Sequence, residues 1–391
     1  MATYPVKYIN DSMRGAPQLS GTAGTLIAVL DAFLLTGFGQ VTALAVTVAD
    51  GIATASVQPG QTFDVGCVVL VEGSTQSALN GEARVLSASN TSITWATDAP
   101  PGAAGGAIHI KVAPVGWWEK KFSSGNVAVY RSTHPLASGF CWRVDDSGAT
   151  FARTRGFEAM SDVDTGLGPF PTNAQLNNGG YLHKSTTAGA AAVPYDFAAD
   201  AQTILAAIAS GRPSGATFLV SPIRGFGDML PLRPSGDGFA VALPTNVSTN
   251  TVFGAFDTTV SGASAVYLAR SHTGIGGAVS SGARAYVTTS DSGLSGNDPY
   301  LGAFPSSVDG ALRYCRRYIY ADDGVTPRAE VPGVLHIPQS GVRSSISARD
   351  VLTGTGELAG RKLVALNHAN GSAITVAPGG LTLLDITGPW R

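Results

Sequence analysis

Short apolar runs alternate with polar residues along most of the chain and predict β-strands. From about residue 41, turn residues separate these runs every ~8–12 residues, which is typical of a small β-sandwich or barrel. The dipeptides Asp50-Gly51 and Asn80-Gly81 favour the left-handed backbone of tight hairpin turns. We therefore predict one compact β module over residues 41–113, with residues 100–106 as a long loop within it.

One segment has a different period and predicts a short amphipathic helix over residues 20–37. Thr22 or Thr25 is placed to cap its N-terminus, and Gly37 is placed to end it. The apolar residues that share one helical face are Leu26, Ile27, Leu30, Phe33 and Leu34. We expect this face to pack against a larger body.

A second β region begins at residue 116. Residues 145–148 (DDSG) form a predicted hairpin turn, and residues 161–178 are rich enough in Gly and Pro to predict a loop. Residues 201–209 are ambiguous, because alanine favours a helix, but their short length and strand-like neighbours favour a strand. The same alternation of strand-like runs and turns continues from residue 218 to the end.

These patterns predict an all-β, multi-domain fold of sandwich or barrel-like architecture with one short N-terminal helix. The expected parts are an arm and helix at 1–40, a small Ig-like β-sandwich module at 41–113, a β domain at 114–250 and a C-terminal β region at 251–391. The last region alternatively forms one domain with 114–250. No internal repeat of fixed period is present, so a solenoid or propeller is not indicated.

The composition is poor in charge. Of 391 residues, 13% are charged, about half the usual ~25% share, and 49 are glycine. Small uncharged residues suit close-packed β structure and surfaces buried in an assembly. A secreted or periplasmic monomer is the alternative, since such proteins also replace Lys and Glu by Ser, Thr and Gly.

The charge distribution does not favour nucleic-acid binding. The formal net charge is −2, and no long run of Lys or Arg is present. The densest basic stretch, residues 313–318 (RYCRRY), could contact a nucleic acid or glycan, but a strand with arginines on one face is the preferred interpretation.

Cysteine usage and the N-terminal sequence indicate folding in a reducing cytoplasm. Cys67, Cys141 and Cys315 are far apart among apolar neighbours and predict buried free thiols rather than disulfides. The N-terminus lacks the basic start and apolar core of a signal peptide. The longest apolar run, residues 25–38, is interrupted by Asp31 and is too short to span a bilayer, so no membrane insertion is expected.

No motif predicts catalysis, a cofactor or a metal, and we expect a non-enzymatic protein. The chain has no G-x-S-x-G and no Walker A loop, and residues 354–360 are interpreted as a turn rather than a dinucleotide site. Residues 162–166 and 322–324 are interpreted as Asp-rich turns rather than Ca²⁺ loops. The histidines lack metal-ligand spacing: His109, His134, His183, His272, His336 and His368.

Two groups of residues leave a glycan-directed activity open. Glu158, Asp162 and Asp164 lie close enough in sequence to be considered as a glycosidase carboxylate pair, although chance proximity is the preferred explanation. Four aromatic residues could stack on sugars if exposed, but we expect them to fill the core: Trp117, Trp118, Phe140 and Trp142.

Over residues 10–240 the chain resembles a family of virion structural proteins of tailed bacteriophages. The most specific stretch is 12–24 (SMRGAPQLSGTAG). The other stretches that carry the resemblance are Leu30-Asp31, 36–39 (TGFG), 79–85 (LNGEARV), 130–132 (YRS), 143–146 (RVDD), 156–166 (GFEAMSDVDTG), 225–228 (GFGD) and 231–234 (PLRP).

The resemblance implies a virion protein associated with the tail or baseplate. The expected partners are copies of itself and other virion proteins of the tail tube, baseplate or capsid. A capsid decoration or head protein, and a glycan-binding tail component that contacts the host surface, are the alternatives. The segment 12–24 is expected either to lie against a neighbouring subunit or to follow the domain's own surface. The candidate assembly contacts are Met13, Arg14, Gly15, Pro17, Leu19 and Gly21.

Overall fold

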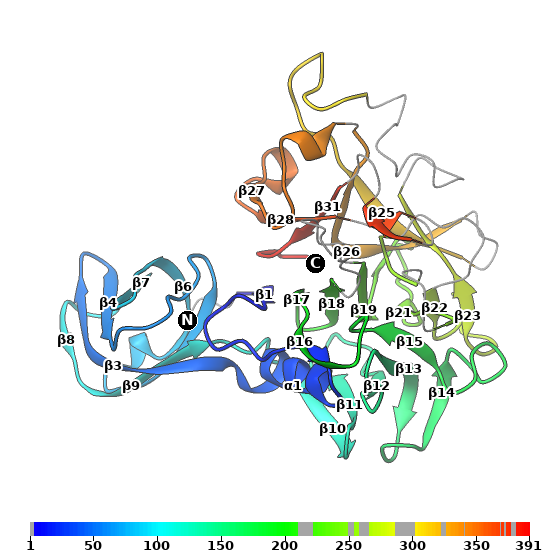
Figure 1. Ribbon diagram of the computed structural model, residues 1–391, viewed down its shortest axis with the longest axis horizontal. Coiled ribbons are helices and arrows are strands. Elements are labelled where there is room, and N and C mark those ends of the chain that lie inside the picture. Colours follow the sequence, from blue (N-terminus) through cyan, green and yellow to red (C-terminus); the bar gives the residue numbers. More distant parts are fainter. Residues whose placement is uncertain are drawn as a thin grey trace.

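The computed structural model describes residues 4–209, 222–248, 254–257, 266–285, 302–321, 326–339, 341–367, 369–370, 373–376 and 381–391. Most of these residues lie in antiparallel strands, and the described part contains one short α-helix, which confirms the all-β fold class. A small barrel lies to one side of a larger body built from three main sheets and the helix (Figure 1).

The small module is a closed six-stranded antiparallel barrel. Its strands, in sequence order, are β3 (Phe38–Ala49), β4 (Ile52–Val57), β5 (Val68–Ser74), β6 (Gly81–Ala88), β7 (Ser92–Ala96) and β9 (Gly106–Val112). They pair in the order β4-β7-β6-β5-β9-β3, and β3 pairs again with β4 to close the barrel. Closure distinguishes the module from an Ig-like sandwich, whose two sheets keep free edges.

The length and bend of β3 make this closure feasible. Its first half pairs with β9 and its second half with β4, with shifts of register between Phe38 and Val41 and between Ala43 and Ala45. Such irregularities bend a strand and increase its twist. The interior is filled by buried aliphatic side chains around Trp95, which is 1% exposed.

The lower part of the larger body in Figure 1 is a six-stranded sheet. Five strands follow in sequence order: β10 (Trp118–Ser124), β11 (Val127–Ser132), β12 (Cys141–Asp145), β13 (Phe151–Met160) and β14 (Gly166–Phe170). The sixth, β15 (Gly180–His183), pairs with the first half of β13, whereas β14 pairs with its second half. Two strands therefore share one edge of β13.

The helix α1 (Thr25–Asp31) packs beside this sheet and continues as a π-helix over Ala32–Thr36 that ends at Gly37, as predicted. The predicted threonine cap is wrong. Gly24 occupies the N-cap position with a left-handed backbone, and no side chain at that position caps the helix. Instead, the Asp146 carboxylate accepts the backbone N–H of Leu26 at 2.8 Å from a distant turn.

Two further sheets form the rest of the larger body. The first contains β1 (Lys7–Asn10), β17 (Tyr195–Ala199), β18 (Thr203–Ile208), β19 (Ile223–Asp228), β21 (Val241–Pro244), β22 (Val266–Leu268) and β23 (Val279–Ser281). The second contains β24 (Ala283–Ala285), β25 (Cys315–Tyr320), β26 (Pro327–Ile337), β31 (Leu381–Asp385), β28 (Lys362–Leu366) and β27 (Val351–Thr353), with β20 (Leu230–Pro231) on β26. A buried apolar cluster joins the two sheets.

The remaining strands form two short pairs, β2 (Ser20–Gly21) with β16 (Gly189–Ala192) and β29 (Ala369–Asn370) with β30 (Ala373–Val376). The 3-10 turns are Ser77–Leu79, Val342–Ser344 and Gly356–Leu358.

Three segment predictions can be compared with these strands. The strand expected within 201–209 is confirmed by β18. The loop expected at 100–106 is wrong in part, because β8 (Gly102–Ala104) pairs with β3. The loop expected at 161–178 is also wrong in part, because it contains β14. Its sequence, GLGPF, contains two glycines and a proline, which are depleted in strands, and Pro169 is tolerated because β14 lies at a sheet edge.

Candidate functional site

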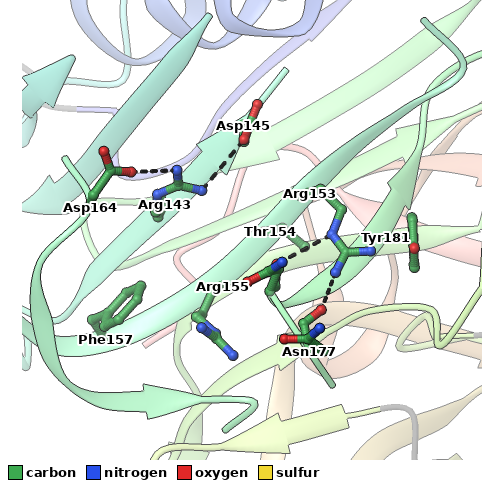
Figure 2. A pocket seen from close by; sticks show the side chains of 10 residues that line it. Arg143, Asp145, Arg153, Thr154, Arg155, Phe157, Asp164, Asn177 and Tyr181 are labelled. Carbon is green, nitrogen blue, oxygen red and sulfur yellow. Dashed lines mark hydrogen bonds and ion pairs between the residues drawn. The ribbon is translucent and has the colours of Figure 1, made fainter. Parts of the chain in front are cut away.

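A polar pocket of about 580 Å³ opens on the sheet that contains β12 and β13. It lies where β14 and β15 part along the edge of β13, because residues 171–179 leave the sheet between these two strands. Its lining is Arg143, Asp145, Arg153, Thr154, Arg155, Phe157, Asp164, Asn177, Asn178 and Tyr181, and we call it the arginine pocket (Figure 2).

Strand register brings the three arginines together. Arg143 on β12 lies directly opposite Arg155 on β13, and the alternation of side chains puts Arg153 on the same face as Arg155. Like charges directly opposite each other across two strands are destabilising. Burial, together with Arg143 and Arg153, lowers the pKa of Arg155.

Both aspartates that line the pocket interact with the same arginine. Arg143 donates to the Asp164 carboxylate at 2.8 Å, and its Nη1 lies 3.8 Å from Asp145 (Figure 2). Within the described part of the chain, no carboxylate lies within ion-pair distance of Arg153 or Arg155. The lining thus holds three arginines against two aspartates, an excess of one positive charge.

Backbone carbonyls of the segment 171–179 fix the other two guanidinium groups. Arg155 donates through Nε to Pro171 O at 2.9 Å, and through Nη2 to Asn173 Oδ1 at 2.6 Å and Leu176 O at 3.2 Å. Arg153 likewise donates hydrogen bonds through Nε and Nη2 to three consecutive backbone carbonyls, those of residues 177–179. Among the described residues, the Nη1 group of each arginine has no acceptor.

This arrangement can bind an anion. Each Nη1 group carries two N–H donors, and neutral acceptors hold each guanidinium in place before a ligand arrives. The amino-acid sequence gives little indication of the pocket. Arg143 lies ten residues before the Arg-x-Arg segment at 153–155, and only the strand register brings these arginines together. Our sequence analysis missed it.

A second surface, on the barrel, is notable for its lack of charge. A row of side chains crosses five strands, because Ala103 pairs with Thr47, Thr47 with Thr54, Thr54 with Thr94, and Thr94 with Ser87. The hydroxyls of Ser87 and Thr94 lie 2.7 Å apart. The strand segments that form this surface are residues 102–104, 45–49, 52–57, 92–96 and 85–88, and they contain no charged residue. We call it the hydroxyl face.

The candidate assembly residues of the arm make contacts within the chain. Met13 and Leu19 are buried in the apolar core. Arg14 donates to Gln61 O and lies over the Phe63 ring on the barrel side. Pro17 O accepts a hydrogen bond from Tyr195 at 2.9 Å.

The two glycines of the arm lie at close backbone approaches. Gly15 packs against Gly39, which lies near the start of β3 of the barrel, and Gly21 lies in the short strand β2. A Cβ at Gly21 would lie 1.9 Å from Thr187 O, so only glycine fits there. The arm thus links the barrel to the larger body.

The three acidic residues considered for glycoside hydrolysis each have a different partner. Glu158 pairs with Arg270 through both carboxylate oxygens, at 2.6 and 2.7 Å. Asp162 accepts the backbone N–H groups of Asp164 and Thr165, which lowers its pKa as expected in an Asx turn. The predicted Asp-rich turn at 162–166 is therefore confirmed.

The core prediction holds for most of the aromatic residues. Trp118 and Trp142 are buried, and Trp142 stacks on Phe226 at 5.9 Å between ring centroids. Phe140 is half-buried. The prediction is wrong for Trp117, which is 52% exposed and has a left-handed backbone with φ 63°.

The basic stretch 313–318 forms part of β25, but its arginines do not share one face as predicted. Arg316 pairs with Glu330 at 2.6 Å on the outside, whereas Arg317 is buried and donates to Asp257 O. Arg313 pairs with Asp309. Nearby acids therefore neutralise the exposed arginines.

Other sequence predictions can be placed briefly. Cys67, Cys141 and Cys315 are buried and form no disulfide, as predicted. In the described ranges, no group of three or more His, Cys, Asp or Glu side chains is arranged to hold a metal ion. The turn 322–324 and His368 lie outside those ranges. None of the described helices has the length and apolar character needed to cross a membrane.

No protein-family model matches the chain, and no curated protein matches it.

Proposed function

We propose that the chain is a structural component of a tailed-bacteriophage virion, in the tail or baseplate. It acts through contacts with copies of itself and with neighbouring virion proteins, and no residue performs chemistry. The observation that carries this proposal is the hydroxyl face, a five-strand surface without a charged residue.

A surface without charged groups costs little free energy to cover with another protein. Charged groups lose strong hydration when a partner covers them, and interface cores are accordingly depleted of charge. Hydroxyl groups such as those of Thr47 and Ser87 can exchange water for a partner's backbone groups at little cost. The exposed Leu86, which is 48% exposed beside this face, adds apolar area.

The direct test is to locate the chain in purified particles of the phage that encodes it. Antibody labelling at the tail, with few copies per particle, supports the proposal. Labelling distributed over the capsid supports the decoration alternative instead. Absence of the chain from infectious particles contradicts both.

A glycan-binding tail component is a second candidate, and the arginine pocket favours it. An exposed pocket with fixed, unneutralised donors suits recognition of a host-surface polymer. The test is co-sedimentation of the purified chain with host capsule or lipopolysaccharide, with an assay for new reducing ends. Binding without release of sugar supports this candidate, and release of sugar contradicts the non-enzymatic role.

A further inference from the structure

We propose that the arginine pocket binds an acidic saccharide unit, that is, a sugar that carries a carboxylate or a phosphate. This inference rests on the second candidate function and specifies its ligand and its site. The observation behind it is the pair of Nη1 groups on Arg153 and Arg155, which have no acceptor among the described residues while every other N–H-bearing nitrogen of the two guanidinium groups is used.

The case for an anion follows from charge and from fixed geometry. Arg153 and Arg155 are two residues apart on one face of β13, and Arg143 faces Arg155 from β12. Asp164 and Asp145 engage Arg143 and leave the other two without a counter-charge. An oxyanion between the two Nη1 groups would accept charge-assisted hydrogen bonds and relieve the repulsion between the arginines.

The case for a saccharide follows from the pocket's size and walls. A volume of about 580 Å³ lies in the range of small-molecule sites. The exposed side chains of Asn177 and Asn178 line it. Amides both donate and accept hydrogen bonds, as sugar hydroxyls do, so these walls suit a hydroxylated ligand better than an apolar one.

The aromatic residues argue against a nucleic-acid strand. Single-stranded nucleic acids bind through exposed aromatic rings on which bases stack. Phe157 is buried, and the Arg153 guanidinium lies 3.9 Å from the centroid of the Tyr181 ring and covers one of its faces. The pocket therefore offers donors for an anion without a free platform for a base.

The test is calorimetric titration of the full chain with four small probes: glucuronate, glucose 6-phosphate, glucose and inorganic phosphate. We expect one or both acidic sugars to bind, glucose not to bind, and inorganic phosphate to bind more weakly than the sugar phosphate. Binding of glucuronate alone identifies a carboxylate ligand, and binding of glucose 6-phosphate alone identifies a phosphate ligand. A short oligothymidylate serves as a fifth probe.

Two variants place the binding in the pocket. Arg155→Gln removes one donor pair and should weaken binding about tenfold or more, the loss expected for a charge-assisted contact. Asn177→Asp adds a negative charge to the wall; the Asn177 side chain makes no hydrogen bond among the described residues, so this variant keeps the anchoring of Arg153 and should also weaken binding. Arg313→Gln is the control, because it removes an exposed arginine that lies outside the pocket, just before β25. Circular dichroism checks that each variant is folded.

The inference is overturned if no acidic sugar binds, if glucose binds equally well, or if the oligonucleotide binds more tightly than either acidic sugar. It is also overturned if Asn177→Asp, in its folded form, binds like the parent chain. Co-sedimentation with host polysaccharide distinguishes failure of the pocket assignment from failure of the proposed glycan-binding function. If the parent and Asn177→Asp bind the polymer equally, the chain binds glycan elsewhere, whereas no binding by the parent contradicts the function itself.

Discussion

The hydroxyl face and the arginine pocket are both outer surfaces of antiparallel sheets, yet they differ in their content of charged residues. Five strand segments of the barrel contribute no charged residue to the first, whereas two strands place three arginines together in the second. A surface that another protein covers is easier to desolvate when it carries no charge. A pocket that holds an anion attracts it more strongly when positive charges are concentrated there. This difference is the basis on which we propose large-area contact for the barrel and ligand recognition for the β12–β13 sheet.

The largest expected effect concerns the interior of the barrel. Trp95→Ala should destabilise the chain by about 3–5 kcal/mol, because it leaves a cavity in a small core. Leu44→Ala, at a side chain that is 62% exposed, is the control and should change the free energy of unfolding by less than about 0.5 kcal/mol. Denaturant unfolding measures both. Equal effects would mean that the barrel has no tight core and cannot present a fixed face.

The next effect concerns the buried ion pair that holds the helix to the pocket-bearing sheet. Lys184 and Asp146 are both 0% exposed, and Lys184 also donates to Thr22 O at 2.8 Å. Lys184→Met should cost about 3–5 kcal/mol, because it leaves the Asp146 carboxylate buried without a counter-charge.

The matched control is Lys120→Met, which breaks the half-exposed pair of Lys120 with Asp31 and should cost about 1 kcal/mol or less. Thermal or denaturant unfolding compares the two variants. A larger loss for Lys120→Met than for Lys184→Met would contradict the role given to burial.

A smaller effect concerns the pH dependence of stability that arises from His183 in the pocket-bearing sheet. Burial, with Arg224 nearby, lowers the pKa of His183 on β15 from 6.5 to about 4. Between these pH values the unfolded chain binds a proton that the folded chain does not, so stability falls as pH falls from about 6.5 through about 4. His183→Gln should reduce this loss when unfolding is measured at pH 7 and at pH 4.5. An unchanged pH dependence would exclude His183 as its source.

Local patterns predicted what depends on local sequence. The helix end at Gly37, the strand within 201–209 and the three buried cysteines follow from neighbouring residues. Features that depend on distant pairing were not predicted. The capping of Leu26 by Asp146 joins residues 120 positions apart. The arginine pocket exists because the register of β12 with β13 makes Arg143 face Arg155, and no sequence pattern encodes that register.

Long-range pairing also explains the domain layout. β1, from the N-terminal arm, pairs with β17, almost 190 residues away, and the sheet continues to β23. The residue ranges 1–40, 114–250 and 251–391 all contribute strands to this sheet. The six barrel strands, by contrast, all come from one continuous stretch of the chain, from β3 to β9.

The most direct test of the central claim is incorporation of a barrel-face variant into phage particles. Thr47→Lys with Ser56→Lys places two charges at exposed positions of the barrel strands that form the hydroxyl face, and Ser123→Lys with Ser124→Lys places two charges at the exposed end of β10. Both double variants should fold, with stability changes within about 0.5 kcal/mol per site. We expect the first double variant to be lost from purified particles and the second to be retained. Equal retention of both would contradict this expectation.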